Sequence, residues 1–232
     1  MKQITFASFK GGAGKTTAAM AVTSTLVDMG KRVALIDADE NIPLLEWRDQ
    51  AIKATTWSDA IEVYEADDLK SFEQAYEDAS TKGFDYCIID TRGGGSELNN
   101  ACLINTGLVI IPSALTTLDM TQALTTFEHV IGLHQHIKME ITTALLVQRV
   151  PVGKLTVSQR QDLAAMSELP CCETHLHSRD AFASLGKRGL MHMVHAQMVD
   201  DPMKRISANH MATAMEEARA LTGDLLEALG ET

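Results

Sequence analysis

The glycine-rich segment KGGAGKTT, residues 10–17, constrains the fold more than any other part of the chain. It follows the apolar run Ile4–Phe9, a predicted strand, and leads into a helical pattern that extends from Thr16 to Met29. Glycines allow the chain to turn tightly and to point backbone N–H groups inward, and a helix N-terminus adds partial positive charge. This order of strand, loop and helix predicts a phosphate-binding loop at the edge of a parallel sheet.

The polar side chains of this loop have separate predicted roles. Lys15 is expected to reach the β- and γ-phosphates of a nucleotide, the Thr16 hydroxyl to ligate Mg²⁺, and Thr17 to donate to the α-phosphate. The backbone of the loop would cradle the phosphates. The predicted nucleotide-binding residues of the loop are Gly11, Gly12, Ala13, Gly14, Lys15, Thr16 and Thr17.

Lys10 is an additional lysine that an ordinary phosphate loop does not need. The ordinary pattern, G-x-x-x-x-G-K-[ST], has a single lysine, and here Phe9 occupies the place of its first glycine. Lys10 would lie on the outer lip of the loop, so it either points into solvent or reaches a nucleotide bound to a second subunit. In the second case it would stabilise charge on the transferred phosphoryl group, as arginine fingers supplied in trans do.

Apolar runs alternate with helical patterns along the rest of the chain. The further predicted strands cover residues 32–37, 62–66, 86–90, 107–112, 141–147 and 171–175. The further predicted helices cover residues 69–79, 97–105, 119–136, 158–166, 180–185 and 202–229, with Asp119 as the N-cap of the 119–136 helix. This alternation predicts right-handed crossovers and a three-layer α/β fold with a mostly parallel, doubly wound sheet. A single domain over residues 1–232 is the simplest organisation.

Three aspartates follow predicted strands. Asp37 and Asp39 lie where the second strand ends, and two carboxylates beside a triphosphate would repel it unless Mg²⁺ and an attacking water lay between them. Asp90 ends the third buried strand, where a Walker-B aspartate holds Mg²⁺ through water. The three glycines after it would move an amide toward the γ-phosphate. Arg92 is expected to be a surface charge, with a contact to phosphate or to a partner as the alternative.

Acidic side chains outnumber basic ones by 31 to 20, which gives a net charge of −11. A surface of that charge repels nucleic acid on average, so any DNA contact must use a local basic patch, a groove built by a dimer or a partner protein. The candidate basic positions are Lys187, Arg188, Lys204 and Arg205. The four cysteines form no C-x-x-C pair, and no apolar stretch approaches the ~20 residues of a membrane span, so we expect reduced thiols in a cytoplasmic protein. The histidines lack carboxylates or cysteines at metal-ligand spacing, so no zinc site is expected.

The loop KGGAGKTT resembles the deviant Walker A motif, K-G-G-x-G-K-[ST], of the ParA/MinD ATPases. The resemblance implies a P-loop NTPase fold, ATP and Mg²⁺ as cofactors, and a homodimer that forms when ATP is bound. It also implies that Lys10 crosses this dimer, that Asp39 orients the hydrolytic water, and that Asp37 supports Mg²⁺ from the outer shell. The implied catalytic residues are thus Lys10, Lys15 and Asp39, and the implied metal residues are Thr16 directly and Asp37 and Asp90 through water.

Two loops depart from the pattern of that family. After the Walker-B strand the family often has D-x-P-P or D-x-x-G, whereas this chain has the sequence DTRG at residues 90–93. The family contacts adenine from the loop after the fifth strand, often through an asparagine, whereas this chain offers Gln148 and Arg149. Arg149 either contacts the base or is a structural ion-pair partner.

Longer segments narrow the resemblance. FKGGAGKTT, RVALIDADEN, GGSELNN and QRVPVGKLTVSQR are similar to the VirC-type ATPases of the T-DNA transfer system, which work beside a relaxase on DNA near a transfer border. The resemblance implies a slow, partner-stimulated ATP hydrolase that switches between monomer and dimer and promotes processing and transfer of DNA in the relaxosome. A relaxase or a DNA-binding accessory protein is the implied partner.

Three other functions are alternatives. A ParA-type plasmid partition ATPase is the main one. A MinD-like membrane switch would need a basic amphipathic C-terminal helix, but residues 211–232 carry five acidic residues and one arginine, so no direct membrane insertion is expected. A reductase related to the nitrogenase iron protein would need cysteines that share a cluster across a dimer, and Cys87 lies inside a predicted strand.

Overall fold

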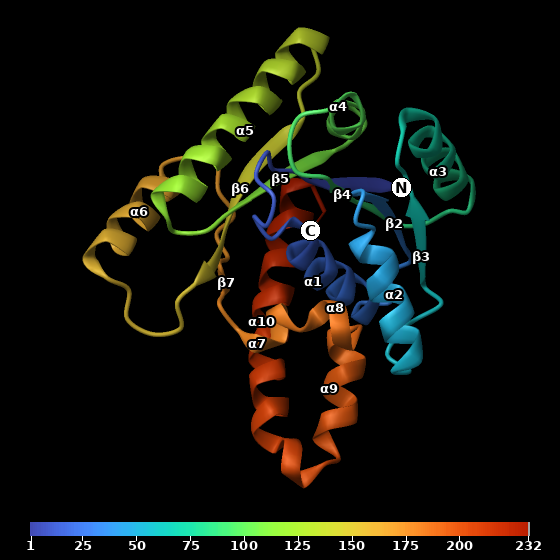
Figure 1. Ribbon diagram of the computed structural model, residues 1–232, viewed down its shortest axis with the longest axis vertical. Helices are drawn as coiled ribbons and strands as arrows, with labels where there is room; N and C mark the ends of the chain where they lie inside the picture. Colours follow the sequence, from blue (N-terminus) through green and yellow to red (C-terminus); the bar gives the residue numbers. More distant parts are fainter. Residues whose placement is uncertain (232) are drawn as a thin grey trace.

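Strands and helices alternate throughout residues 1–231, the part of the chain that the computed structural model describes. Seven strands form one sheet in the order β3-β2-β4-β1-β5-β6-β7, and every neighbouring pair is parallel. The strands are β1 (Lys2–Phe6), β2 (Val33–Ala38), β3 (Ile61–Glu65), β4 (Tyr86–Thr91), β5 (Leu108–Ser113), β6 (Thr142–Val150) and β7 (Leu176–His177). This arrangement confirms the predicted α/β fold with a parallel, doubly wound sheet (Figure 1).

The central strands are apolar on both faces because helices cover both sides of the sheet. In β5, Leu108 and Ile110 point into one core, and Val109 and Ile111 point into the other. Successive side chains of a strand point to opposite faces, so an uninterrupted apolar run satisfies two cores at once. The carboxyl ends of β1, β2 and β4 lie together at one edge of the sheet, where the candidate site is found.

Ten α-helices in the described residues form the two outer layers. The helices α1, α2 and α7–α10 pack on one face of the sheet, and α3–α6 pack on the other (Figure 1). Their bounds are α1 (Lys15–Asp28), α2 (Pro43–Lys53), α3 (Leu69–Thr81), α4 (Glu97–Ile104), α5 (Thr117–Ile137), α6 (Val157–Ser167), α7 (Asp180–Ala183), α8 (Leu185–Arg188), α9 (Met191–Val199) and α10 (Arg205–Ala228), with a 3₁₀ turn at Pro202–Lys204.

The C-terminal helix α10 packs along α1, and its end is fastened to the sheet. Lys2 Nζ lies 3.1 Å from Glu231 Oε1, and the Tyr86 hydroxyl donates a hydrogen bond to the same carboxylate. Met211, Ala218 and Leu225 of this helix are buried in the core, and Met215 and Leu229 pack against it while partly buried. None of the helices within residues 1–231 is long and apolar enough to cross a membrane.

The structure corrects several predicted boundaries. The helix α5 begins at Thr117 with Thr116 as its N-cap, so the prediction of Asp119 as the cap was wrong. The predicted strand 171–175 is instead a single bridge between Cys171 and Leu145, and the regular pairing starts at Leu176. Helices α2 and α9 were not predicted. Thr232, the last residue of the predicted single domain, lies outside the described residues, and the single-domain organisation stays a prediction.

Candidate functional site

The loop between β1 and α1 has the backbone that glycines permit. Gly12 and Gly14 have φ values of +74° and +93°, which ordinary side chains avoid. A Cβ on Gly14 would also overlap the side chain of Gln148, whose Nε2 donates a hydrogen bond to the Ala13 carbonyl. Within the described part of the chain no side chain caps α1, so the N–H groups of its first turn stay available to an anion.

Lys15 enters this loop from the first residue of α1 and is 5% exposed. Burial lowers the pKa of its ammonium group, and the negative charges of Asp90 and Asp39 partly oppose that effect. A buried cation with carboxylates nearby is the environment expected of a lysine that receives phosphates.

Thr16 and Asp90 form the polar pair below the loop. The Thr16 hydroxyl donates to Asp90 Oδ2 at 2.5 Å, and Asp90 is fully buried. Burial raises the pKa of Asp90 to about 7, even though Thr16 and Lys15 favour its ionised form. The other oxygen, Oδ1, is buried and has no hydrogen-bond partner among residues 1–231.

These two residues fit a divalent cation. Mg²⁺ prefers oxygen ligands and keeps several waters while it binds one or two protein groups and substrate phosphates. A hydroxyl oxygen beside a carboxylate with an unsatisfied buried oxygen provides that donor set. The described residues contain no cluster of three His, Cys, Asp or Glu side chains that could hold a metal by themselves, so phosphate and water would supply most of the ligands.

Asp37 and Asp39 face different surroundings. Asp37 Oδ2 accepts hydrogen bonds from the backbone N–H groups of Leu44 (2.7 Å) and Leu45 (3.3 Å) and thereby caps α2. Burial raises the pKa of Asp37 to about 6, against these hydrogen bonds. Asp39 instead lines the cavity over the phosphate loop, and its Oδ1 accepts from the backbone and side chain of Asn41 at 2.9 and 2.8 Å. The outer-shell role of Asp37 stays a prediction, since α2 already uses much of its carboxylate.

Two cavities meet at the carboxyl edge of the sheet. One, of about 390 Å³, is lined by Gly11, Gly12, Gly14, Lys15, Thr16, Thr17, Asp39, Glu40, Asn41, Arg92, Gly93 and Arg149. The other, of about 340 Å³, is lined by Thr17, Gln148, Arg149, Leu176, His177, Ser178, Arg179, Phe182 and Ala183. They share Thr17 and Arg149. The first is rich in charge and in backbone N–H groups, and the second combines polar side chains with the apolar surfaces of Leu176, Phe182 and Ala183.

The loop after β4 packs directly on the phosphate loop. A Cβ on Gly93 would lie 3.1 Å from the Gly11 nitrogen, so the two backbones are in close contact. Arg92 lines the phosphate cavity and pairs with Glu40, with 3.2 Å between Nη1 and Oε1. The sequence pattern did not point to Glu40. Arg92, expected as a surface charge or alternatively as a contact to phosphate or a partner, is partly exposed and lines the cavity. The position of Glu40, directly after Asp39, was the signal available for it.

Lys10 lies on the rim rather than among the residues that line the phosphate cavity. Its side chain is 32% exposed, and its Nζ lies 2.5 Å from Asp119 Oδ1 at the start of α5. Burial raises the pKa of Asp119, but the hydrogen bonds from Lys10 and Thr116 outweigh it and hold that pKa below its usual value. Asp119 is thus the partner of the additional lysine in this structure, a contact the sequence did not reveal.

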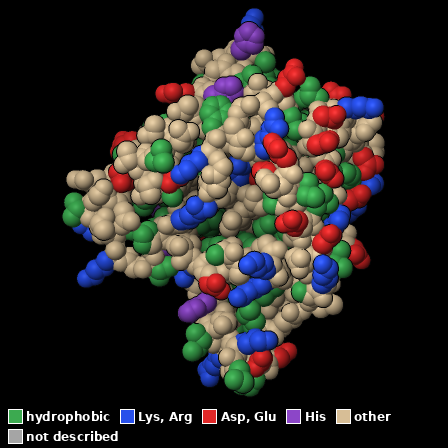
Figure 2. Space-filling model, in the orientation of Figure 1, with side chains coloured by type: hydrophobic (Ala, Val, Ile, Leu, Met, Phe, Trp, Pro, Cys, Tyr) green, Lys and Arg blue, Asp and Glu red, His purple; other side chains and the backbone are tan. Residues whose placement is uncertain are grey.

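The predicted basic positions lie on α8 and near the turn between α9 and α10. Lys187 and Arg188 are in α8, Lys204 is in the 3₁₀ turn, and Arg205 begins α10. Lys and Arg side chains lie over α8 and the hairpin of α9 and α10, whereas Asp and Glu gather over α3 (Figure 2).

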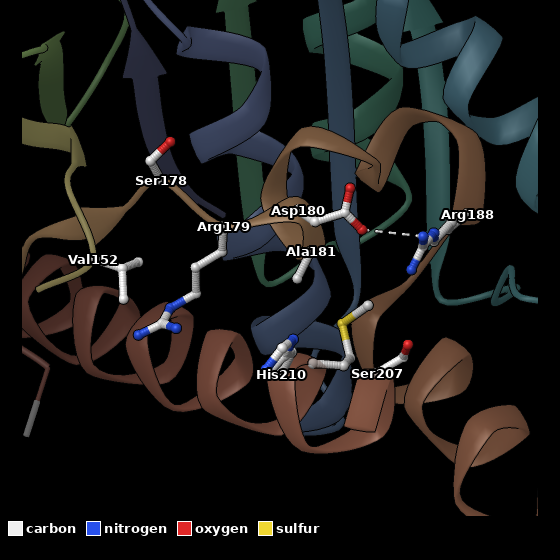
Figure 3. A pocket seen from close by; sticks show the side chains of 9 residues that line it. Val152, Ser178, Arg179, Asp180, Ala181, Arg188, Ser207 and His210 are labelled. Atoms are coloured by element: carbon white, nitrogen blue, oxygen red, sulfur yellow. Dashed lines mark hydrogen bonds and ion pairs between the residues drawn. The ribbon is translucent and has the colours of Figure 1, made fainter. Parts of the chain in front are cut away.

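A third cavity, of about 260 Å³, separates α7 and α8 from the start of α10. Figure 3 shows Arg188 turned toward Asp180, at 3.2 Å, with Ser207 and His210 across on α10. Arg179, also at this cavity, is paired with Glu217 at 2.6 Å. Both arginines of this cavity therefore have a carboxylate partner, and that of Arg188 is exposed.

Comparisons with known proteins agree with these features. The family model described as "VirC1 protein" matches residues 1–231. Protein virC1 of Rhizobium radiobacter is 48% identical over 217 residues, which cover 94% of each chain. Protein virC1 of Rhizobium rhizogenes is 46% identical over 230 residues, which cover 98% of this chain and all of that one.

Solved structures share the fold at lower identity. An ATP complex of a McdA variant from Cyanothece superposes with a TM-score of 0.68 at 20% identity and covers all of this chain and 97% of that one. The MinD cell division protein of Aquifex aeolicus superposes with a TM-score of 0.67 at 18% identity and covers all of this chain and 98% of that one. At these identities the likeness concerns the fold.

Proposed function

Because this chain belongs to the VirC1 family and has the fold of the ParA/MinD P-loop NTPases, we propose that it is an ATPase whose ATP-bound homodimer acts on DNA or nucleoprotein complexes in T-DNA transfer. The observation that carries this proposal is the phosphate loop itself. Lys15 and Thr16 of this loop line the cavity, and the Thr16 hydroxyl donates to Asp90, whose other carboxyl oxygen is buried and unsatisfied within residues 1–231.

The two adjoining cavities would hold the two ends of ATP. The phosphates would lie over the loop, where the amides of the glycines and of the first turn of α1 donate to them and Lys15 neutralises their charge. Thr16 and Asp90 would hold Mg²⁺, which spreads the charge of the phosphate oxygens, with Asp37 as a more distant support. The base would enter the second cavity between Phe182 and Arg149.

Hydrolysis needs a water placed in line with the terminal phosphate. Asp39 lines the phosphate cavity, and its contacts with Asn41 fix the orientation of its carboxylate. We assign to Asp39 the orientation of the attacking water and acceptance of a hydrogen bond from it. The Asp39→Ala variant should keep nucleotide affinity and lose about 100-fold or more in hydrolysis rate, as removal of a group needed for proton transfer does.

Dimerisation would use Lys10. A contact of its ammonium group with a desolvated phosphate of the partner subunit is worth ~1.5–3 kcal/mol as a charge-assisted hydrogen bond, and a symmetric dimer contains two of them. ATP thereby links two subunits, and hydrolysis removes the link. Slow hydrolysis, stimulated by a partner, sets the lifetime of the dimer.

DNA binding would use the side of the molecule that carries α8 and the start of α10. Two copies of Lys187, Arg188, Lys204 and Arg205 aligned in one dimer double the local positive charge, so DNA affinity should depend on ATP. A relaxase or another DNA-bound protein is the partner that this function requires.

The test combines hydrolysis, light scattering and DNA binding on the purified full chain. Wild type should hydrolyse ATP slowly and bind duplex DNA more tightly with ATP than without it. Asp39→Ala should remain dimeric with ATP. The variant Lys187→Ala/Arg188→Ala should weaken DNA binding, unlike the charge-matched control Lys53→Ala/Lys70→Ala on α2 and α3. Equal DNA affinity with and without ATP would contradict the switch.

A further inference from the structure

We propose that Arg92 is a phosphate-contacting residue whose guanidinium exchanges the carboxylate of Glu40 for the terminal phosphate of ATP. This inference rests on the proposed ATP site and adds to it a residue that discriminates ATP from ADP. It starts from the position of the Arg92–Glu40 ion pair, because both residues line the phosphate cavity.

The backbone beneath Arg92 is fixed against the phosphate loop. Asn99, 5% exposed in α4, donates from Nδ2 to the carbonyls of Arg92 (3.1 Å) and Gly94 (2.6 Å). Gly93 lies against the backbone of Gly11, with no room for a larger residue unless one of the two shifts. The backbone at Arg92 is therefore held beside the phosphate loop, while its side chain can change partner.

The side chain of Arg92, in contrast, is held weakly. Its hydrogen bond to Glu40 is the one that the guanidinium makes within residues 1–231. The Glu40 side chain is 75% exposed and that of Arg92 is 35% exposed, so water screens the pair and it contributes little to stability. Four of the five N–H donors of the guanidinium remain available for a ligand.

Phosphate is a better partner than this carboxylate. A terminal phosphate carries more negative charge and offers oxygens that match the planar guanidinium in a bidentate contact. Glu40 adjoins Asp39, the residue assigned to the hydrolytic water, and Arg92 adjoins Gly93, so the pair borders the end of the cavity away from the base. A phosphate at that end is present in ATP and absent in ADP.

The exchange also couples two loops. While Arg92 holds Glu40, the loop of residues 39–41 is tied to the loop of residues 92–95, 52 positions away along the chain. When phosphate takes the guanidinium, Glu40 is released at the moment when Asp39 must orient water. The ion pair therefore forms when the terminal phosphate is absent and breaks when it is bound.

Calorimetric titration of the full-length protein with Mg²⁺ and either ADP or the non-hydrolysable analogue AMPPNP tests the proposal. Arg92→Gln should weaken AMPPNP binding about 10-fold or more, the loss of a charge-assisted bidentate contact, and change ADP binding by less than about 2-fold. Glu40→Gln frees the guanidinium and should strengthen AMPPNP binding about 2-fold, with ADP unaffected. Arg92→Lys keeps the positive charge but lacks the planar guanidinium, so its AMPPNP affinity should lie between those of wild type and Arg92→Gln.

Arg48→Gln is the matched control, because Arg48 has the same side-chain exposure, 35%, and pairs with an exposed carboxylate, Asp49, on the outer side of α2. It should leave both affinities unchanged. An equal loss for AMPPNP and ADP in Arg92→Gln, or no loss for either, would overturn the inference while wild type still binds both nucleotides. Failure of wild type to bind either nucleotide would instead overturn the proposed function, and the inference with it.

Discussion

The two lysines of the phosphate loop lie five positions apart and have opposite surroundings. Lys15 is 5% exposed, and burial lowers the pKa of its ammonium group between the charges of Asp90 and Asp39. The Lys10 side chain is 32% exposed and is held by one contact, to Asp119. The fold fixes the first ammonium in place, whereas the second has a partner that it can exchange.

This difference assigns the two lysines to different steps, Lys15 to nucleotide binding and Lys10 to dimerisation. A buried cation is costly unless an anion compensates it, so Lys15 gains most when phosphates arrive in its own subunit. Lys10 is partly exposed and its ion-pair partner Asp119 is 14% exposed, so exchange of that partner for a phosphate replaces one charge-assisted contact with another. One loop thus carries Lys15, which is suited to phosphates bound in its own subunit, and Lys10, which is suited to phosphates bound in the partner subunit.

The largest effect expected is that of Lys15→Ala. Removal of the buried ammonium takes away the main positive charge facing the phosphates, so the affinity for ATP should fall at least 100-fold. Equilibrium binding of a fluorescent ATP analogue measures it, with Lys53→Ala, an exposed lysine at the end of α2, as the control. Retained affinity would mean that the buried lysine has a structural role only.

Lys10→Ala should leave ATP affinity within about 3-fold of wild type, because Lys10 does not line the phosphate cavity. The ATP-dependent dimer should weaken about 100-fold, since two symmetric charge-assisted contacts of roughly 10-fold each are lost. Sedimentation velocity with AMPPNP measures the dimerisation constant. If Lys10→Ala dimerised as strongly as wild type, Lys10 would have no role in the dimer, and its proposed difference from Lys15 would be wrong.

Asp119→Asn tests the same comparison by changing the partner of Lys10 instead of Lys10 itself. It keeps the size of the side chain but removes the charge that holds Lys10 in its own subunit, so the ATP-dependent dimer should become about 3-fold tighter. Thr116→Val, which removes the N-cap of α5 and the other hydrogen bond to the Asp119 carboxylate but leaves its charge, is the control and should leave dimerisation nearly unchanged. A weaker dimer in Asp119→Asn would show that the carboxylate positions Lys10 for the trans contact instead of competing with it.

The smallest expected effect is on stability against pH. The pKa of Asp119 is held below its usual value in the folded protein, so the ion pair with Lys10 contributes stability above the unfolded pKa of about 4 and loses it as the pH falls through the lower folded pKa. Urea unfolding should give a difference between wild type and Asp119→Asn that is below about 1 kcal/mol and constant from pH 7 to pH 5. The difference should shrink below about pH 4. A difference that grew toward acid pH would contradict the assignment.

Much of the fold could be predicted because its signals are local. The apolar runs of the strands and the helical spacing of α1, α3 and α10 specify elements by near neighbours in the chain. Helix α2 escaped prediction although Leu44, Trp47 and Ala51 have helical spacing, since its N-terminal cap is the side chain of Asp37. That cap precedes the helix by six residues and is not the usual adjacent Ser, Thr, Asp or Asn.

The sequence by itself determined the phosphate loop, the two lysines and the order of strands and helices, because each depends on contacts within a few residues. The tertiary structure decided which side chains meet: Lys10 with Asp119 across 109 positions, and Arg92 with Glu40 across 52. It also turned Asp37 toward α2 and Asp39 toward the cavity. The physical reason is that parallel strands bring distant chain segments to one edge of the sheet, where charges select partners by distance in space.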